Sequence, residues 1–225
     1  MVDDVRQPLD SATIIGLIAS TGEEPWGVDV PFGWPDGFVD LMATRHRAPL
    51  SEGLLPAEGD WAVWRTRDIA QRRTDAFLTH HEQVLVRPLP AAFQMLGSTA
   101  AMWVLIESRL ASIGINIDRS GAQGRVFETY PRAALAGWGH RQPGKTDLST
   151  LEAVFPVLRV AASWRSAFDN DHACDALVCA LVSRARDLGL TVGPPAEDAA
   201  AARREGWIHV SLDSSDKLTN TDLTR

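Results

Sequence analysis

The chain has 225 residues, of which 45% are hydrophobic and 23% charged, and its net charge is −7. This length and composition fit one globular domain with a sizeable core. The negative charge excludes a protein that coats nucleic acid nonspecifically, but it allows a nuclease with a local basic groove. Because no apolar run approaches about eighteen residues and no apolar leader segment is present, we expect no membrane span and no signal peptide.

The predicted elements alternate between helices and short strands along the chain. Helices are expected over residues 8–20, 36–46, 75–83, 92–112, 131–137, 148–168, 172–188 and 196–204. Strands are expected over residues 26–30, 113–118, 124–129 and 206–210, and a loop over 47–65. This order predicts an α/β fold, with a mixed sheet and helices on its faces. Residues 1–210 then form a single domain, and the polar residues 211–225 form a disordered tail.

The only two cysteines, Cys174 and Cys179, lie in one apolar helical run. Five positions apart on a helix they point in different directions, so a disulfide between them is difficult to form. We therefore expect neither a disulfide framework nor a zinc site, and a cytoplasmic location fits this pattern.

Three acidic residues lie near the ends of predicted elements. Asp29 and Glu128 each close an apolar strand just before a proline turn, and Asp175 lies on an apolar helix one turn after His172. Carboxylates at strand ends of an α/β chain tend to meet at the carboxyl edge of the sheet. Converging carboxylates repel one another unless they are protonated or bridged by a cation, usually Mg²⁺ or Mn²⁺. We therefore expect Asp29, Glu128 and Asp175 to share a divalent metal.

Each carboxylate also has a structural interpretation. Asp29 can cap the proline turn that follows it, and Glu128 can cap its own turn or pair with Arg132. Asp175 interrupts an apolar helix face, so a structural role would require a buried partner such as Arg165.

Four further residues are candidates for substrate contact or proton transfer. Arg72 and Asp75 can hold and orient a phosphate through the arginine fork, although a surface helix with salt bridges is the alternative. Tyr130 is the aromatic residue that we place at the rim of the site. His172 is either a metal ligand, a general base or a residue that caps the helix start.

Five motifs, in this order, resemble those of the DUF429 family, which is described as predicted nucleases with an RNase H-like fold. They are GVDVPFGWP at 27–35, RRTD at 72–75, ETYP at 128–131, DALVCA from 175 and EGWIH at 205–209. The resemblance covers residues 10–210 and implies a metal-dependent hydrolase with acidic residues at the sheet edge. It implies catalytic and metal-binding roles for Asp29, Glu128 and Asp175, with His172 as a further ligand or general base.

One feature departs from the family pattern at the N-terminus. An RNase H-like domain opens with a β-hairpin whose first strand carries a central aspartate. Here no apolar strand with an aspartate precedes Asp29, because Asp3 and Asp4 lie in a polar segment. The resemblance therefore implies a mixed sheet that lacks the N-terminal β-hairpin strands. It also implies an exposed sheet edge that invites a homodimer.

The sequence thus favours a divalent-metal-dependent nuclease that uses Mg²⁺ or Mn²⁺ on nucleic acid or a smaller phosphodiester. The alternative is a non-catalytic binding or assembly module that keeps the fold without a complete metal site. The missing aspartate and the acidic charge favour that alternative. A nucleotide-binding protein is a third interpretation, but no glycine-rich phosphate loop follows a first strand.

Overall fold

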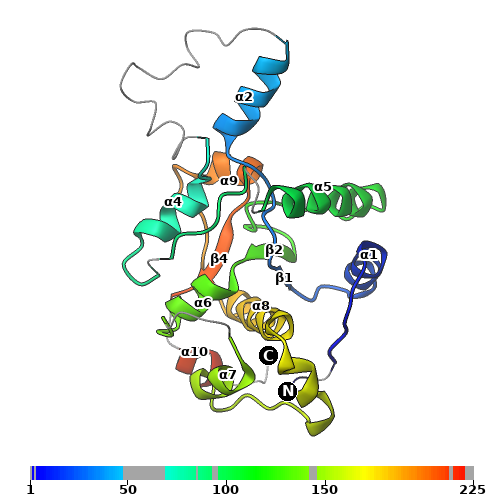
Figure 1. The fold of residues 1–225 in the computed structure, drawn as a ribbon, viewed down its shortest axis with the longest axis vertical. Helices are drawn as coiled ribbons and strands as arrows, with labels where there is room; N and C mark the ends of the chain where they lie inside the picture. The colour runs from blue at the N-terminus through cyan, green and yellow to red at the C-terminus, as the bar shows by residue number, and fades with distance from the viewer. Residues whose placement is uncertain are drawn as a thin grey trace.

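The computed structural model describes residues 2, 4–47, 69–84, 86–92, 96–141, 146–212 and 215–220. Within them a four-stranded open sheet is flanked by helices (Figure 1). The strands are Trp26–Val28 (β1), Val126–Thr129 (β2), Thr191–Val192 (β3) and Ile208–Ser211 (β4). They lie in the order β1-β2-β4-β3, with β1, β2 and β4 parallel and β3 antiparallel to β4. The predicted mixed sheet with flanking helices is confirmed.

The helices follow the predicted pattern closely. They are Ser11–Ser20 (α1), Asp36–Arg47 (α2), Arg73–His80 (α4), Gly97–Ser112 (α5), Pro131–Gly137 (α6), Leu148–Val154 (α7), the 3₁₀ helix Ala162–Asp169 (η3), Asp171–Asp187 (α8), Ala199–Glu205 (α9) and Ser215–Asn220 (α10). Side-chain caps set three of the starts among the described helices: Asp10 accepts the Thr13 N–H at 2.7 Å, Asp147 the Thr150 N–H at 2.7 Å and Asn170 the Ala173 N–H at 3.0 Å. In the part of the chain that the structure describes, every helix is too short or too polar to cross a bilayer.

Three segments differ from the sequence prediction. Residues 113–118 form no strand, since the chain leaves α5 in a turn in which the Ile115 N–H bonds to the Leu110 carbonyl at 2.9 Å. The predicted helix over 148–168 is broken around Pro156, where α7 has ended and η3 has not begun. The predicted tail is ordered in part, because Ser211 belongs to β4 and Leu218 of α10 is only 3% exposed. The predicted loop over 47–65 lies almost wholly outside the described residues.

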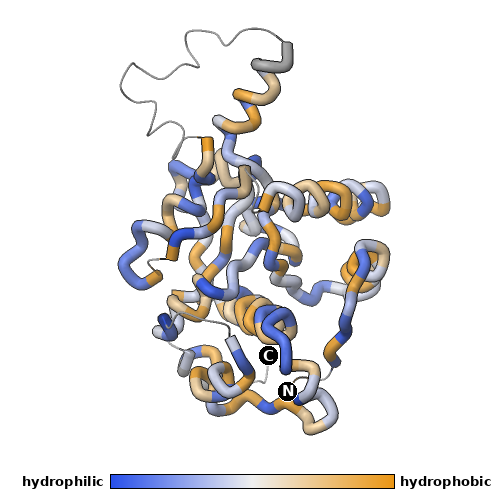
Figure 2. The backbone as a smooth tube through the Cα atoms, in the orientation of Figure 1, coloured by the Kyte–Doolittle hydropathy of each residue, from blue (hydrophilic) through white to orange (hydrophobic). Residues whose placement is uncertain are grey.

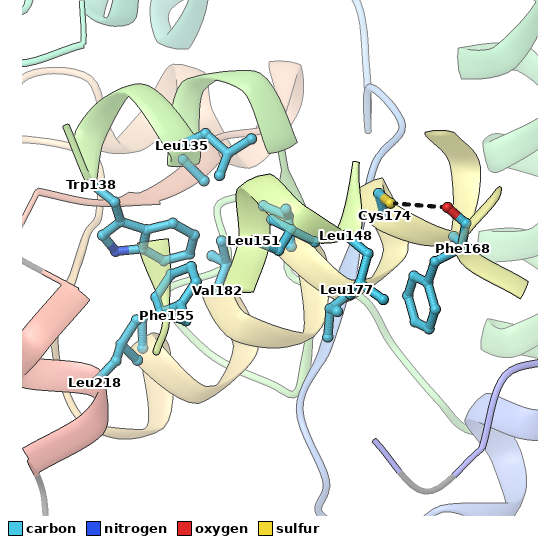
Figure 3. Packing of buried hydrophobic residues seen from close by; sticks show 14 of the residues in the cluster. Leu135, Trp138, Leu148, Leu151, Phe155, Phe168, Cys174, Leu177, Val182 and Leu218 are labelled. Carbon is cyan, nitrogen blue, oxygen red and sulfur yellow. Dashed lines mark hydrogen bonds between the residues drawn. The ribbon is translucent and has the colours of Figure 1, made fainter. Parts of the chain in front are cut away.

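Side-chain alternation along β2 separates the interior into two sides. Phe127 packs with α7 and α8 in the cluster that Figure 3 shows, where Leu151, Leu177 and Val182 lie close together. Val126 packs instead on the opposite side of the sheet, with residues of α5 and α1. Because neighbouring strand residues point to opposite faces, Glu128 lies on the α5 side and Thr129 on the α8 side.

Strand β1 lies at one edge of the described sheet. The Trp26 N–H bonds to the Arg125 carbonyl at 2.6 Å, so the next amide, that of Gly27, points away from β2. Ser183 of α8 accepts the Gly27 N–H at 2.8 Å. This approach requires glycine, because a Cβ on Gly27 would lie 2.7 Å from the Cys179 carbonyl oxygen. Helix α8 therefore satisfies the outward amide of this edge strand, and the homodimer expected through the edge stays a prediction.

Candidate functional site

Asp29 and Asp175 come from different elements to the same side of the sheet. Asp29 directly follows β1, two residues after Gly27. A Cβ on Gly27 would point towards α8, so strand alternation predicts that the Asp29 side chain lies on the same side. Asp175 lies in the first turns of α8, the helix that packs on this side of β1. Figure 2 shows the hydrophilic residues where α8 begins and the hydrophobic stretch that follows them.

The two carboxylates are coupled electrostatically. Asp29 is exposed as a residue, yet the protein around its carboxyl group raises its pKa to about 7. Desolvation is the largest cause, and the negative charges of Asp175 and Glu128 add to it. The pKa of Asp175 is also raised, by burial and then by Asp171, while His172 opposes the shift. The structure thus brings Asp29, Asp175 and the exposed His172 into one neighbourhood.

Glu128 is used differently from the prediction. Its carboxylate is 2% exposed and receives two hydrogen bonds from Arg72, Nη2 to Oε1 at 2.7 Å and Nη1 to Oε2 at 2.9 Å. The Phe32 N–H also donates to Oε2 at 3.0 Å. Because the side chain points to the side of the sheet opposite α8, it does not join Asp175. Among the described residues, no three His, Cys, Asp or Glu side chains gather closely enough to hold a metal ion.

Arg72 and Asp75 belong to the same buried network. The Asp75 carboxylate accepts from the Arg72 guanidinium at 3.1 Å and from the Arg72 backbone N–H at 2.9 Å, which closes the first turn of α4. Arg72 also donates to the Glu205 carbonyl at 3.2 Å. Both side chains are 2% exposed, so as placed they offer no surface to the phosphate that we predicted for them. They join segments of the fold instead.

Glu205 completes this network, and the sequence analysis assigned it no role. Its carboxylate accepts the Asp36 N–H at 2.8 Å and the Arg73 N–H at 2.7 Å. The following Gly206 has a φ of +89°, and a Cβ there would lie 2.7 Å from Oε2 of Glu128. The EGWIH motif was the available signal, because a Glu-Gly pair before a strand marks a tight approach of backbone to side chain. The network holds the loop after β1, and with it Asp29, in place.

Tyr130 lies at the end of β2, half-buried beside the carboxylate pair. Burial raises the pKa of its hydroxyl group, and Arg132 opposes that shift. The charges of Asp29, Asp175 and Asp75 raise it further.

The alternative partners expected from the sequence are not found. Arg165 pairs with Glu152 at 2.7 Å, rather than with Asp175. Glu128 pairs with Arg72 rather than with Arg132. Within the described parts of the chain, neither Asp29 nor Asp175 receives a side-chain hydrogen bond or an ion pair.

Comparison with known families covers four of the five motifs, since EGWIH at 205–209 lies beyond the matched residues. A family model described as a protein of unknown function (DUF429) matches residues 10–200. This chain belongs to the DUF429 family. No curated protein and no solved structure matches it.

The matched region of this DUF429 protein contains the carboxylate pair. Carboxylates close enough to interact repel one another unless one of them is protonated or a cation binds between them. Mg²⁺ is commonly held by one or two carboxylates, with water and substrate phosphate completing its coordination. Asp29 and Asp175 are the residues that a divalent ion would use here, whereas the carboxylate of Glu128 receives hydrogen bonds from Arg72 and from the Phe32 N–H, and its role as a metal ligand stays a prediction.

Proposed function

We propose that this protein is a divalent-metal-dependent phosphodiester hydrolase, a nuclease built on an RNase H-like sheet. Asp29 and Asp175 would bind Mg²⁺ or Mn²⁺. The observation that carries the proposal is the position of Asp29 at the sheet edge near Asp175, where desolvation first, and the charges of Asp175 and Glu128 second, raise the pKa of Asp29 to about 7. Strongly perturbed carboxylates at a sheet edge are characteristic of functional sites, because burial and like charge otherwise destabilise the fold.

Each residue of the site would have a different chemical role. The bound ion would supply a Lewis acid and lower the pKa of a water molecule. Asp29 holds a proton near neutral pH and must release it when the ion binds, so metal affinity should rise with pH. His172, exposed one turn before Asp175, is placed to accept or return a proton. The Arg72–Glu128 pair supports the Asp29 loop through the Phe32 N–H.

One observation favours a non-catalytic binding or assembly module as the second candidate. Glu128, one of the three predicted metal ligands, is fully engaged by Arg72 and Phe32. A site with two ligands instead of three has lower affinity for an ion, and the fold would then serve another partner.

Calorimetric titration with Mn²⁺ and Mg²⁺ at pH 8 decides between the two candidates. We expect saturable binding by the wild type that is lost in Asp29→Asn and Asp175→Asn. The matched control is Asp187→Asn, an exposed aspartate at the far end of the same helix, which should bind as the wild type does. Hydrolysis of bis(p-nitrophenyl) phosphate should follow the same order. The absence of binding at millimolar metal would overturn the hydrolase and leave the binding module.

A further inference from the structure

Arg132 is an exposed arginine close to the carboxylate pair. It occupies the first turn of α6, whose neighbouring residues Pro131, Ala133 and Ala134 are buried. Because the helix packs through those residues, Arg132 faces solvent. Its expected partner Glu128 is occupied by Arg72, and no other residue in the described ranges forms an ion pair with it.

Topology brings Arg132 to the same edge as Asp29. Strands β1 and β2 are parallel, and Val28 is paired with Glu128. The chain therefore leaves both strands at the same edge, first at Asp29 and, from the neighbouring strand, at Tyr130. Arg132 follows after one intervening proline. The positive charge of Arg132 lowers the pKa of the Tyr130 hydroxyl group, and the negative charges of Asp29 and Asp175 raise it.

The sheet edge therefore carries an acidic part, Asp29 with Asp175, and a basic part, Arg132. The pair of carboxylates attracts a cation but repels the negative oxygens of a phosphodiester. A nearby arginine compensates for that repulsion, and its planar fork matches the geometry of two phosphate oxygens. Arg72, which the sequence suggested for this role, has its donors directed to Glu128, Asp75 and a backbone carbonyl.

We propose that Arg132, with Tyr130 beside it, binds the non-bridging oxygens of a phosphodiester whose phosphorus faces Asp29 and Asp175. This inference rests on the proposed hydrolase for its substrate. It assigns to the first turn of α6 the anion-binding function that the buried Arg72 does not perform. The basic contact then comes from the neighbouring strand, while the metal ligands come from β1 and α8.

A ³¹P NMR titration with inorganic phosphate, without metal and at pH 6, tests the anion site by itself. We expect Arg132→Ala to raise the dissociation constant about tenfold or more. Arg132→Lys, which keeps the charge but not the fork, should lie between that variant and the wild type.

Arg165→Ala is the matched control, because Arg165 is exposed and pairs with Glu152 away from this edge. Its phosphate affinity should equal that of the wild type, and all variants should melt at closely similar temperatures. The inference is overturned if the wild type does not bind phosphate or if Arg132→Ala binds it equally well.

A second readout separates this inference from the hydrolase itself. With Mn²⁺ and bis(p-nitrophenyl) phosphate, Arg132→Ala should raise KM more than it lowers kcat, and its Mn²⁺ affinity should be unchanged. Hydrolysis with an unchanged KM would overturn the role of Arg132 and leave the hydrolase standing. Phosphate binding through Arg132 without metal binding or hydrolysis would support the anion site and overturn the hydrolase.

Discussion

Two groups of acidic residues lie around the ends of the neighbouring strands β1 and β2 and have different surroundings. In the buried network, Asp75, Glu128 and Glu205 receive hydrogen bonds from Arg72 or from backbone amides. In the pair at the sheet edge, Asp29 and Asp175 receive no side-chain hydrogen bond or ion pair from the described residues, and the charge of Asp175 raises the pKa of Asp29. A carboxylate with fitted donors stabilises the fold, whereas one that faces another carboxylate is available to a ligand.

The largest loss of stability is expected when the Arg72 side chain is removed from the buried network. Arg72→Leu leaves Asp75 and Glu128 buried without their partner, so we expect the free energy of unfolding to fall by about 3–5 kcal/mol. Urea denaturation measures this loss. The adjacent Arg73, whose side chain is 66% exposed, provides the control, and Arg73→Leu should change stability by less than about 0.5 kcal/mol. A similar result for both variants would show that the network does not stabilise the fold.

Glu128→Gln tests whether the two groups are separate in function. The amide keeps the shape of the side chain and an acceptor for the Phe32 N–H, but it loses the charge that faces Arg72. We expect a loss of about 1–3 kcal/mol in the free energy of unfolding. Calorimetry should show Mn²⁺ binding close to that of the wild type, in contrast to Asp29→Asn. If the folded variant loses Mn²⁺ binding, Glu128 is a ligand and the distinction between the two groups fails.

A third effect is expected in the pH dependence of stability without metal. The pKa of Asp29 is about 7 in the folded protein, against 3.8 as its ordinary value. Between these values the folded state keeps a proton that the unfolded state has lost, so this residue makes stability fall as pH rises from about 4 to 7. Urea denaturation at pH 5 and pH 8 should therefore show a smaller decrease for Asp29→Asn than for the wild type. Equal decreases would mean that Asp29 does not titrate in this range.

Much of the helical structure was predictable because its signals are local. The predicted helix over 131–137 matches α6, since Pro131 marks the first turn and small apolar residues continue it. Either Asp10 or Ser11 suits the start of the predicted helix over 8–20, and the structure has Asp10 as the cap of α1. The strand over 113–118 was predicted wrongly, because its alternating isoleucines pack beside α5 without a neighbouring strand to pair with. β3 was missed, since two residues carry no periodic signal.

The candidate site was predictable only in part. Asp29 and Asp175 were expected to meet, because strand ends and the start of a following helix gather at one edge of a sheet. The fate of Glu128 was not predictable, since its partner Arg72 lies 56 positions away in the chain. Because Glu128 pairs with Arg72, it does not pair with Arg132, which was the partner suggested by the sequence.

The sequence by itself determined the mixed α/β architecture, the family and the acidic residues that close β1 and β2. These features depend on periodicity, turns and caps, which act over a few neighbouring residues. Only the tertiary structure decided which carboxylates are paired with Arg72 and which have no such partner among the described residues. Strand alternation directs Glu128 to the α5 side and Asp29 to the α8 side, and the partners on each side come from distant parts of the chain. Burial and hydrogen-bond partners, which are set by packing, then give residues of the same chemical type different pKa values and different roles.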